Sequence, residues 1–503
     1  MNLVSLLSKY NLALNYFIWD KFGIVFIVCV GILTTILLKF FQIRHIGLWW
    51  SKTFGSLLKK DVLSHSKDKV SISPFQSLCT SLAATLGVGN IVGVSTAICM
   101  GGPGAVFWMW AAAVIGMATS YSENVLGLYF RRKNFSGDWS GGAMYYLSDG
   151  LGGKKGGKTL GKLLAYAFAL FTLLASFGIG SMGQINKIVI NLSSAFPNKY
   201  LSPIIIYDNV SAYSLIIGIV LFFLASCIIL GGINRIARVT EKLVPFMIIF
   251  FTAGSFIVIL KNYNSILPAF KSIFCSAFNI SAGMGGTAGV CISTAFKQGF
   301  KRGVFTNESG LGSSVIVHSA SSVTEPVEQG MWGIFEVFCD TIFVCTITAL
   351  VVLTSGVYDI SSFKAMTDDA TMVAKAFNSV FSIACLGEKF VAISIFLFAF
   401  STVLGWNYYG AKAWEYLFGT NFVFVYRILH LLSIIPGAIL TSSLAWDISD
   451  TFNGLMMIPN LIGVISLMGL VIKITKNYME RKIKGKNILP MISYFKDIQR
   501  KQK

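Results

Sequence analysis

The chain has 503 residues, of which 54% are hydrophobic and only 13% are charged. Because soluble domains carry about 25% charged residues, this composition predicts a polytopic membrane protein. The formal net charge of +19 lies in loops between apolar stretches rather than on one basic face, which argues against nucleic-acid binding.

The nine cysteines form no CxxC pair, and the four histidines form no HExxH motif. The sequence therefore predicts neither a disulfide framework nor a metal-hydrolase centre, and we expect no cofactor and no enzymatic activity. The first strong apolar run begins at Phe22 and no small-residue cleavage site follows it. We therefore expect a retained helix there rather than a signal peptide.

Apolar windows of about 20 residues, the length that spans a bilayer as a helix, recur along the chain. They lie at 22–41, 75–100, 106–130, 163–194, 211–230, 243–260, 266–296, 330–356, 390–406, 423–441 and 455–474. The eleven windows predict an all-α polytopic membrane protein with 11 transmembrane helices. A short surface helix is predicted within 366–382, where Asp368 and Asp369 favour a helix N-terminus.

The distribution of cations predicts the orientation. Threading the windows from an outside N-terminus puts 32 of the 41 Lys and Arg on the cytoplasmic side, the stretch 297–302 included. By the positive-inside rule we expect the N-terminus outside and the C-terminus in the cytoplasm. The expected location is the inner membrane. The basic tail, residues 475–503, is expected to lie against anionic lipid headgroups.

Two glycine-rich stretches interrupt apolar windows. One is Gly87-Val88-Gly89-Asn90, and the other is residues 282–289, which include Gly285, Gly286 and Thr287. Lipid offers no partner for free backbone groups, so such interruptions persist where they face a protein-walled cavity or polar cargo. Paired interruptions are typical of the binding site of a secondary transporter. Close helix packing through Gly89 and Gly93 is the alternative interpretation.

Setting the first window aside leaves ten, of which the interrupted windows are the first and the sixth and run in opposite directions. This predicts a 5+5 inverted repeat preceded by one extra helix. The predicted organisation is an N-terminal segment with a basic loop over residues 1–74, a ten-helix transport core over 75–474 and the tail over 475–503.

Uncharged polar side chains within the windows are candidates for the site. A broken helix presents N–H groups and carbonyls together, which suits a zwitterionic amino acid and a sodium ion. Asn90 and Gln184 can donate and accept, although Gln184 would also serve as an interhelical hydrogen bond. The adjacent hydroxyls of Ser401 and Thr402 suit sodium, or bond back to a carbonyl one turn earlier. Trp406, one turn beyond Thr402, is expected to restrict the pocket to small side chains.

Acidic residues within the windows offer a second means of coupling. Glu123, Glu336 and Asp340 are costly in hydrocarbon and are therefore candidates for an ion or proton step. A paired or protonated structural role is equally open for Asp340. Glu308, which closely follows Lys301 and Arg302, is interpreted as a cytoplasmic gate or loop anchor.

Several blocks of the sequence resemble the alanine or glycine:cation symporter family, also called the sodium:alanine symporter family. They are SLAATLGVGNIVG (81–93), GGPGAVFWMW (101–110), GGAMYY (141–146), GGINRIA (231–237), RGVFTNESG (302–310), FAFSTVLGW (398–406) and EYLFG (415–419). The resemblance implies a leucine-transporter-type fold and sodium-coupled uptake of alanine, glycine or similarly small amino acids. By the same resemblance, sodium would be bound by the carbonyls of Ala83 and Leu86 with the hydroxyls of Ser401 and Thr402. Asn90, Gln184 and Trp406 match family positions that line the substrate pocket.

The sequence thus predicts a symporter that imports a small neutral amino acid with sodium by alternating access. Its expected partners are the substrate, sodium and the lipid bilayer. A proton-coupled permease of the same fold is the first alternative. A channel or a subunit of a membrane enzyme is less favoured, because the sequence offers neither a continuous polar pore nor a set of cofactor ligands.

Overall fold

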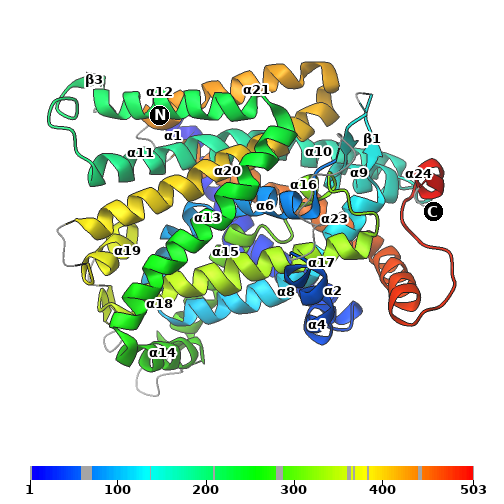
Figure 1. Ribbon diagram of the computed structural model, residues 1–503, viewed down its shortest axis with the longest axis horizontal. Helices are drawn as coiled ribbons and strands as arrows, with labels where there is room; N and C mark the ends of the chain where they lie inside the picture. The colour runs from blue at the N-terminus through cyan, green and yellow to red at the C-terminus, as the bar shows by residue number, and fades with distance from the viewer. Residues whose placement is uncertain are drawn as a thin grey trace.

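The computed structural model describes residues 3–57, 71–135, 137–207, 210–278, 287–359, 364–365, 369–381, 385–439 and 444–501. Most of these residues are helical, and Figure 1 shows the long helices lying side by side along the longest axis of the molecule. Three antiparallel hairpins join helices: β1 (Arg132–Lys133) with β2 (Trp139–Ser140), β3 (Ile205–Tyr207) with β4 (Val210–Ser211), and β5 (Tyr358–Asp359) with β6 (Lys364–Ala365).

Helices make up nearly all of the remaining structure. The N-terminal part holds α1 (Leu3–Tyr16), η1 (Phe17–Phe22), α2 (Gly23–Leu37), α3 (Phe41–Arg44), α4 (Ile46–Lys52) and η2 (Phe54–Ser56). The next part holds α6 (Pro74–Thr85), η3 (Val88–Asn90), α7 (Val92–Gly101), α8 (Gly104–Tyr129), α9 (Ala143–Tyr145), η4 (Tyr146–Leu151), α10 (Lys158–Phe177), η5 (Gly178–Met182), α11 (Gly183–Ala195), α12 (Ala212–Ile229) and α13 (Gly232–Lys261). The last part holds η6 (Tyr263–Ser265), α14 (Ile266–Phe278), α15 (Thr287–Asn307), α16 (Val315–His318), α17 (Pro326–Val337), η7 (Phe338–Cys345), α18 (Thr346–Thr354), α19 (Asp369–Asn378), α20 (Leu386–Phe418), η8 (Thr420–Phe422), α21 (Val423–Leu432), α22 (Ile434–Ile439), α23 (Leu444–Tyr478), η9 (Met479–Ile483) and α24 (Lys496–Lys501).

Within the described residues, nine helical stretches are long and apolar enough to cross a membrane. They are Ser8–Leu37, Gly104–Tyr129, Lys158–Ala195, Ala212–Ile229, Gly232–Lys261, Pro326–Thr354, Leu386–Phe418, Thr420–Ile439 and Asp447–Ile483. The chain is therefore a multi-pass membrane protein, as its composition predicts. The two predicted windows absent from this set, 75–100 and 266–296, are those with glycine-rich interruptions.

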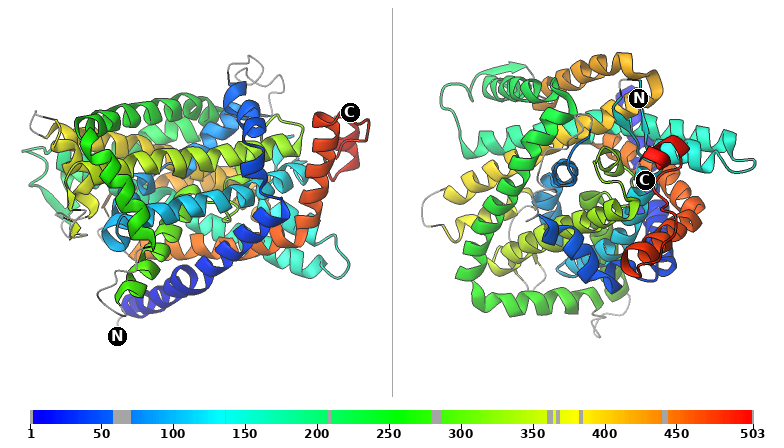
Figure 2. Two further views of the ribbon diagram at one scale, coloured as in Figure 1. Left: turned by 90° about the horizontal axis from the view of Figure 1, so that it is seen from below. Right: turned by 45° about the vertical axis from the view of Figure 1, so that its right-hand side comes forward.

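The N-terminal helical stretch begins at Leu3, well before the predicted start at Phe22. Figure 2 shows this segment, in dark blue, on the outside of the helical bundle. It packs against α23, and the indole Nε1 of Trp19 donates to the Asp450 carbonyl at 3.1 Å. The polar residues before Phe22 lower the mean hydropathy of this helix, so the apolar window began too late. The contacts of the helix with α23 stabilise it despite these residues.

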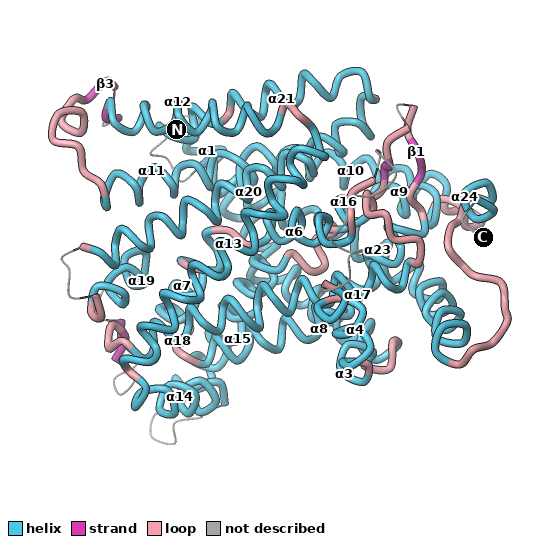
Figure 3. Tube along the Cα trace, viewed as in Figure 1, coloured by secondary structure: helices cyan, strands magenta, loops and turns pink. Residues whose placement is uncertain are grey.

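The first predicted interruption is confirmed. A capping box starts α6, because the Ser73 hydroxyl accepts from the Gln76 amide at 3.1 Å and the Gln76 side chain accepts from the Ser73 amide at 3.0 Å. The helix ends at Thr85, the backbone is extended at Gly87, and a single 3-10 turn, η3, leads into α7. Figure 3 shows short loop segments in the middle of the helical bundle, near α6 and α7.

A further interruption, which the sequence analysis did not predict, lies at residues 308–314 and approaches η3. The chain leaves α15 after Asn307 and takes left-handed backbone conformations at Glu308 (φ 53°), Gly310 (φ 89°) and Gly312 (φ 77°) before α16 begins. Glycine adopts such left-handed conformations at low steric cost. Gly285 and Gly286 lie outside the described residues, and Thr287 is the first residue of α15.

The described residues of the predicted window 266–296 belong to two helices, α14 and the first part of α15. In Figure 1, α14 is seen nearly end-on where α8 and α15 lie lengthwise. One face of α14 is buried at Ala269 and Ile273, whereas Leu267 and Phe274 on the other face are exposed. A hydropathy average does not distinguish such a transverse helix from a spanning one. As a further correction, residues 297–302 lie inside α15 rather than in a loop.

Two predictions concern peripheral segments, and the structure confirms one of them. The surface helix predicted within 366–382 is confirmed as α19. Part of the basic tail folds back on the protein, because the Tyr494 amide donates to the Tyr129 carbonyl at 2.9 Å and the Tyr494 ring lies 5.0 Å from that of Phe130. Contact of the tail with lipid headgroups stays a prediction.

Candidate functional site

Asn90 completes the broken end of α6. Its side-chain oxygen accepts the Gly87 amide at 3.0 Å. In a continuous helix that amide would donate to the carbonyl of Ala83, four residues earlier. The break therefore leaves the Ala83 carbonyl without its helical donor, and the carbonyl of Leu86 follows at the very end of the helix.

Two hydroxyls of α20 meet these carbonyls. The Ser401 hydroxyl lies 3.3 Å from the Ala83 carbonyl oxygen, and the Thr402 hydroxyl lies 3.3 Å from that of Leu86. All four groups are buried. Two oxygens at this separation can both touch one hard cation at about 2.3–2.6 Å. The donor set of two carbonyls and two neutral hydroxyls therefore fits a small monovalent cation.

The alternative interpretation of these hydroxyls is also visible in the structure. Ser401 donates to the Phe398 carbonyl at 2.7 Å, and Thr402 donates to the same carbonyl at 3.1 Å. Such a bond back to the preceding turn is the usual state of a hydroxyl in a membrane helix. It directs each hydroxyl proton to Phe398 and leaves the oxygen lone pairs free for a cation.

Gln184, in α11, faces the same break. A Cβ atom on Gly87 would lie 2.9 Å from the Thr402 hydroxyl and 3.4 Å from the Gln184 side-chain oxygen. That amide oxygen is buried and has no hydrogen-bond partner in the described part of the chain. Because buried polar atoms are nearly always satisfied in native proteins, an unpartnered acceptor beside a helix break indicates a ligand.

Glu308 connects the interruption at 308–314 to α20. Its carboxylate accepts from the Trp406 indole nitrogen at 3.0 Å and from the Ser313 hydroxyl. Glu308 is buried at 4% exposure and ties the non-helical stretch 308–314 to α20, as the loop-anchor interpretation predicts. The role of a cytoplasmic gate stays a prediction. Trp406 is fully buried, and its ring packs on Gly180, where a Cβ atom would lie only 2.5 Å from that of Trp406.

The two interruptions are also joined through Asp340 of η7. The Asn90 amide nitrogen donates to the Asp340 carboxylate at 2.7 Å, and the Thr341 hydroxyl donates to its other oxygen at 2.8 Å. Asn307, the last residue of α15, donates to the Thr341 hydroxyl at 3.1 Å. One buried carboxylate therefore holds the ends of both broken elements.

The other two acids predicted as candidates, Glu336 and Glu123, are also buried and hydrogen-bonded. The Glu336 carboxylate accepts from the Ser81 hydroxyl on α6 and lies 2.9 Å from the His318 ring nitrogen at the end of α16. The Glu123 carboxylate accepts from the Asn460 side chain, which also donates to the Gly310 carbonyl at 2.8 Å. Each acid thus ties a spanning helix to one of the interrupted segments.

The structure brings most of the predicted site residues to one place. Ala83, Leu86, Gly87, Asn90, Gln184, Ser401 and Thr402 surround the first break. Val88 is buried within the 3-10 turn, and a Cβ atom on Gly89 would lie 3.0 Å from the Thr306 methyl group, so the two interruptions touch there. Trp406 reaches the site through Glu308. The sequence analysis did not predict that Glu308 lies beside Trp406 at the end of α15. The pair Gly310 and Gly312 just after it could have indicated a helix end.

Comparison with known proteins shows which family the chain is similar to. The sodium:alanine symporter family matches residues 4–491. The sodium/alanine symporter AgcS of Methanococcus maripaludis is 41% identical over 493 residues, which cover 97% of this chain and 100% of that protein. The probable sodium/glutamine symporter GlnT of Bacillus subtilis is 34% identical over 487 residues, covering 96% of this chain and 92% of that protein.

The similarity extends to a solved structure. The crystal structure of MhsT in complex with L-phenylalanine matches with a TM-score of 0.52 at 13% identity, covering 82% of this chain and 99% of that chain. At this identity the likeness shows the fold alone, which is of the leucine-transporter type. The similar proteins found by sequence and by structure are thus transporters and not enzymes. It belongs to the sodium:alanine symporter family.

Proposed function

We propose that the protein carries a small neutral amino acid, such as alanine or glycine, into the cell together with sodium by alternating access. The main support for this proposal is that two carbonyls at the end of α6 lie beside the hydroxyls of Ser401 and Thr402. The side-chain oxygen of Gln184, which has no hydrogen-bond partner in the described residues, lies next to them. AgcS and GlnT are both named as sodium symporters of an amino acid, which supports this coupling. One charge crossing 100 mV is worth about 2.3 kcal/mol, so one sodium ion would sustain roughly fifty-fold accumulation.

The proposed architecture has eleven spans in a 5+5 inverted repeat after one extra helix. Nine continuous spans and two interrupted ones, α6 with α7 and α15 with α16, support that number. Residues 297–302 lie within α15, and taking their three cations from the 32 leaves 29 of 41 on the proposed cytoplasmic side. The positive-inside rule therefore still favours an outside N-terminus, a cytoplasmic C-terminus and location in the inner membrane.

The test of this function is uptake of labelled alanine into proteoliposomes. We expect uptake when an inward sodium gradient is imposed and background counts when choline replaces sodium. The alternative, a proton-coupled permease, would use Glu123, Glu336 or Asp340, and would instead show uptake driven by a pH gradient in choline. Each of the three acids accepts a hydrogen bond from a buried side chain of another element, Ser81, Asn90 or Asn460, which favours a bracing role over proton transfer.

The first expected effect of a mutation concerns sodium. Thr402→Ala removes one of the four proposed ligands, so the sodium concentration for half-maximal uptake should rise several-fold while the protein still inserts. Thr354→Ala is the matched control, because Thr354 makes the same bond to the preceding turn, to Leu350 at 2.8 Å, away from the break. Unchanged sodium dependence in both Thr402→Ala and Ser401→Ala would contradict the assignment.

The second expected effect concerns selectivity. Trp406→Ala opens space beside Gly180 and removes a donor from Glu308. Alanine uptake should weaken, whereas leucine and methionine should compete better than in the wild type, since excluding one methylene by shape is worth about 1–3 kcal/mol. Competition of unlabelled amino acids against labelled alanine measures this. An unchanged order of competitors would assign the size limit to other residues.

A further inference from the structure

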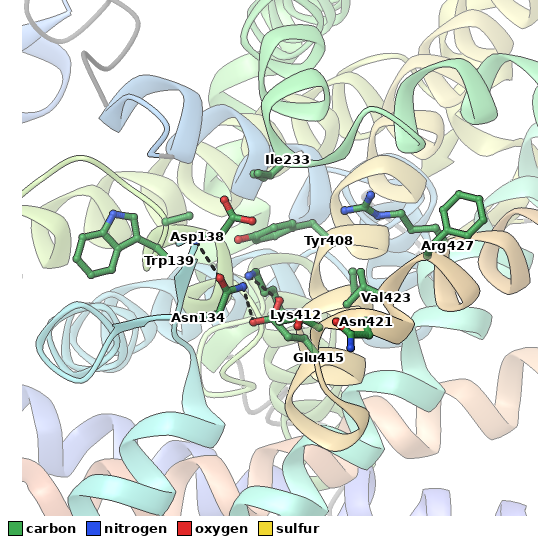
Figure 4. A pocket seen from close by; sticks show the side chains of 14 residues that line it. Asn134, Asp138, Trp139, Ile233, Tyr408, Lys412, Glu415, Asn421, Val423 and Arg427 are labelled. Carbon is green, nitrogen blue, oxygen red and sulfur yellow. Dashed lines mark hydrogen bonds and ion pairs between the residues drawn. The ribbon is translucent and has the colours of Figure 1, made fainter. Parts of the chain in front are cut away.

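A cavity of about 260 Å³ lies at a different level of the bundle from the helix breaks. Its walls come from the β1–β2 hairpin, the start of α13 at Ile233, the end of α20 and the start of α21 (Figure 4). Along α20 it begins at Tyr408, and Lys412 lies ten residues beyond Thr402, or about 15 Å along the helix. Pockets for drug-sized ligands measure about 300–1,000 Å³, so this cavity has room for one smaller molecule.

Two of the four charged residues that line the cavity neutralise each other. The Lys412 ammonium lies 2.8 Å from the Glu415 carboxylate and 3.1 Å from the Ser140 hydroxyl. The other Glu415 oxygen accepts from Asn134 at 3.1 Å. These groups form a closed network, which Figure 4 marks with dashed lines, and they leave no charge for a ligand.

The other two charged residues, Asp138 and Arg427, are without ion-pair partners in the part of the chain that the structure describes. In Figure 4 they lie on opposite sides of the Tyr408 ring. The guanidinium lies over Gly232, where a Cβ atom would be 3.4 Å from it and where φ is +69°. Arg427 stands in the second turn of α21 and is partly buried. The charges of Asp138 and Glu415 act on it from a distance greater than that of an ion pair, so its guanidinium is available to a ligand.

We infer that this cavity binds a zwitterionic α-amino acid, with its ammonium at Asp138 and its carboxylate at Arg427. A guanidinium suits a carboxylate because it can donate two parallel hydrogen bonds, and a single carboxylate suits an ammonium. The proposal rests on the proposed function, because the amino acid would be the transported substrate. In the proposed orientation the cavity faces the cytoplasm. It would be a second binding site, which the substrate occupies after leaving the helix breaks and before its release into the cytoplasm.

Protection of an introduced cysteine tests this inference. Asn421 lines the cavity and is exposed, so Asn421→Cys in a background with the nine native cysteines replaced should react with a water-soluble maleimide. The full-length protein is held in nanodiscs of lipids without primary amines, which keeps lipid ammonium groups from competing. Alanine at about four times its dissociation constant should slow modification about fivefold, since protection follows 1 + [L]/Kd. Alaninamide and propionate, which each lack one charge, should protect far less.

Variants separate this cavity from the site at the breaks. Asp138→Asn and Arg427→Gln should each abolish protection by alanine, and Asp138 is exposed, so its substitution leaves the fold intact. Arg238→Gln, an exposed cation on α13 outside the cavity lining, should keep protection. Gly87→Val, which fills the first break, should also keep it.

Two kinds of result would overturn the inference. One is equal protection by alanine, alaninamide and propionate, or none by any of them. The other is loss of alanine protection in Gly87→Val, which would place the effect at the helix breaks. Failure of sodium-driven alanine uptake with protection intact would overturn the proposed function instead.

Discussion

Replacing Gly87 by valine is expected to abolish sodium-driven alanine uptake while the protein still inserts. The first added carbon would lie 2.9 Å from the Thr402 hydroxyl and 3.4 Å from the Gln184 oxygen, so the side chain would push apart the proposed ligands of sodium and substrate. A displacement of about 1 Å at a reacting or binding centre can cost on the order of 100-fold in rate. The measurement is initial uptake in proteoliposomes, normalised to the amount of inserted protein.

Gly469→Val is the control for this substitution. Gly469 lies in α23, and a Cβ atom there would meet no other atom within 4 Å, so the same change of side chain should leave uptake close to that of the wild type. Normal uptake by Gly87→Val would show that this glycine serves only helix packing. The corresponding test at Gly286 has no structural basis, because that residue lies outside the described ones.

Glu308→Gln is expected to reduce alanine uptake about tenfold, since leaving the buried Ser313 hydroxyl without its acceptor costs about 1–3 kcal/mol. Glutamine keeps the shape of the side chain and an oxygen that can accept from Trp406, so the fold should persist. What it removes is the second acceptor oxygen, because an amide nitrogen cannot accept from the Ser313 hydroxyl. Uptake rates and alanine affinity should both be measured, because they separate binding from turnover.

The control for the carboxylate is Glu388→Gln. Glu388 lies in the first turn of α20 and bonds to Asn378 at 3.1 Å, away from both interruptions. Its substitution should change uptake little. Equal uptake by Glu308→Gln and the wild type would mean that Glu308 serves only as a neutral hydrogen-bond acceptor for Trp406.

The first break could be predicted from sequence because its signals are local. Gly87 and Gly89 stand within an apolar window, and Asn90 supplies the side chain that closes the break three residues later. The break at 308–314 was harder to predict. The Glu308-Ser309-Gly310-Leu311-Gly312 stretch holds only two glycines, fewer than the run at 282–289, so a search for glycine-rich stretches passes over it.

The contacts of the buried acids could not be predicted. Asp340 was equally open to a structural and a coupling role, because its partners Asn90 and Thr341 come together only after the chain folds. The same holds for Trp406. Its spacing from Thr402 on one helix face was readable, whereas its bond to Glu308 joins residues 98 positions apart.

Asn90 has a consequence for how much of the binding free energy remains available after the ion binds. One side chain accepts the Gly87 amide and donates to Asp340, and the Thr348 hydroxyl donates to the Asn90 carbonyl at 2.9 Å. These bonds within the chain fix the shape of the break before any ligand arrives. Binding then loses little conformational entropy in ordering the backbone, so more of the ion's binding free energy is left to drive the change between outward-facing and inward-facing states.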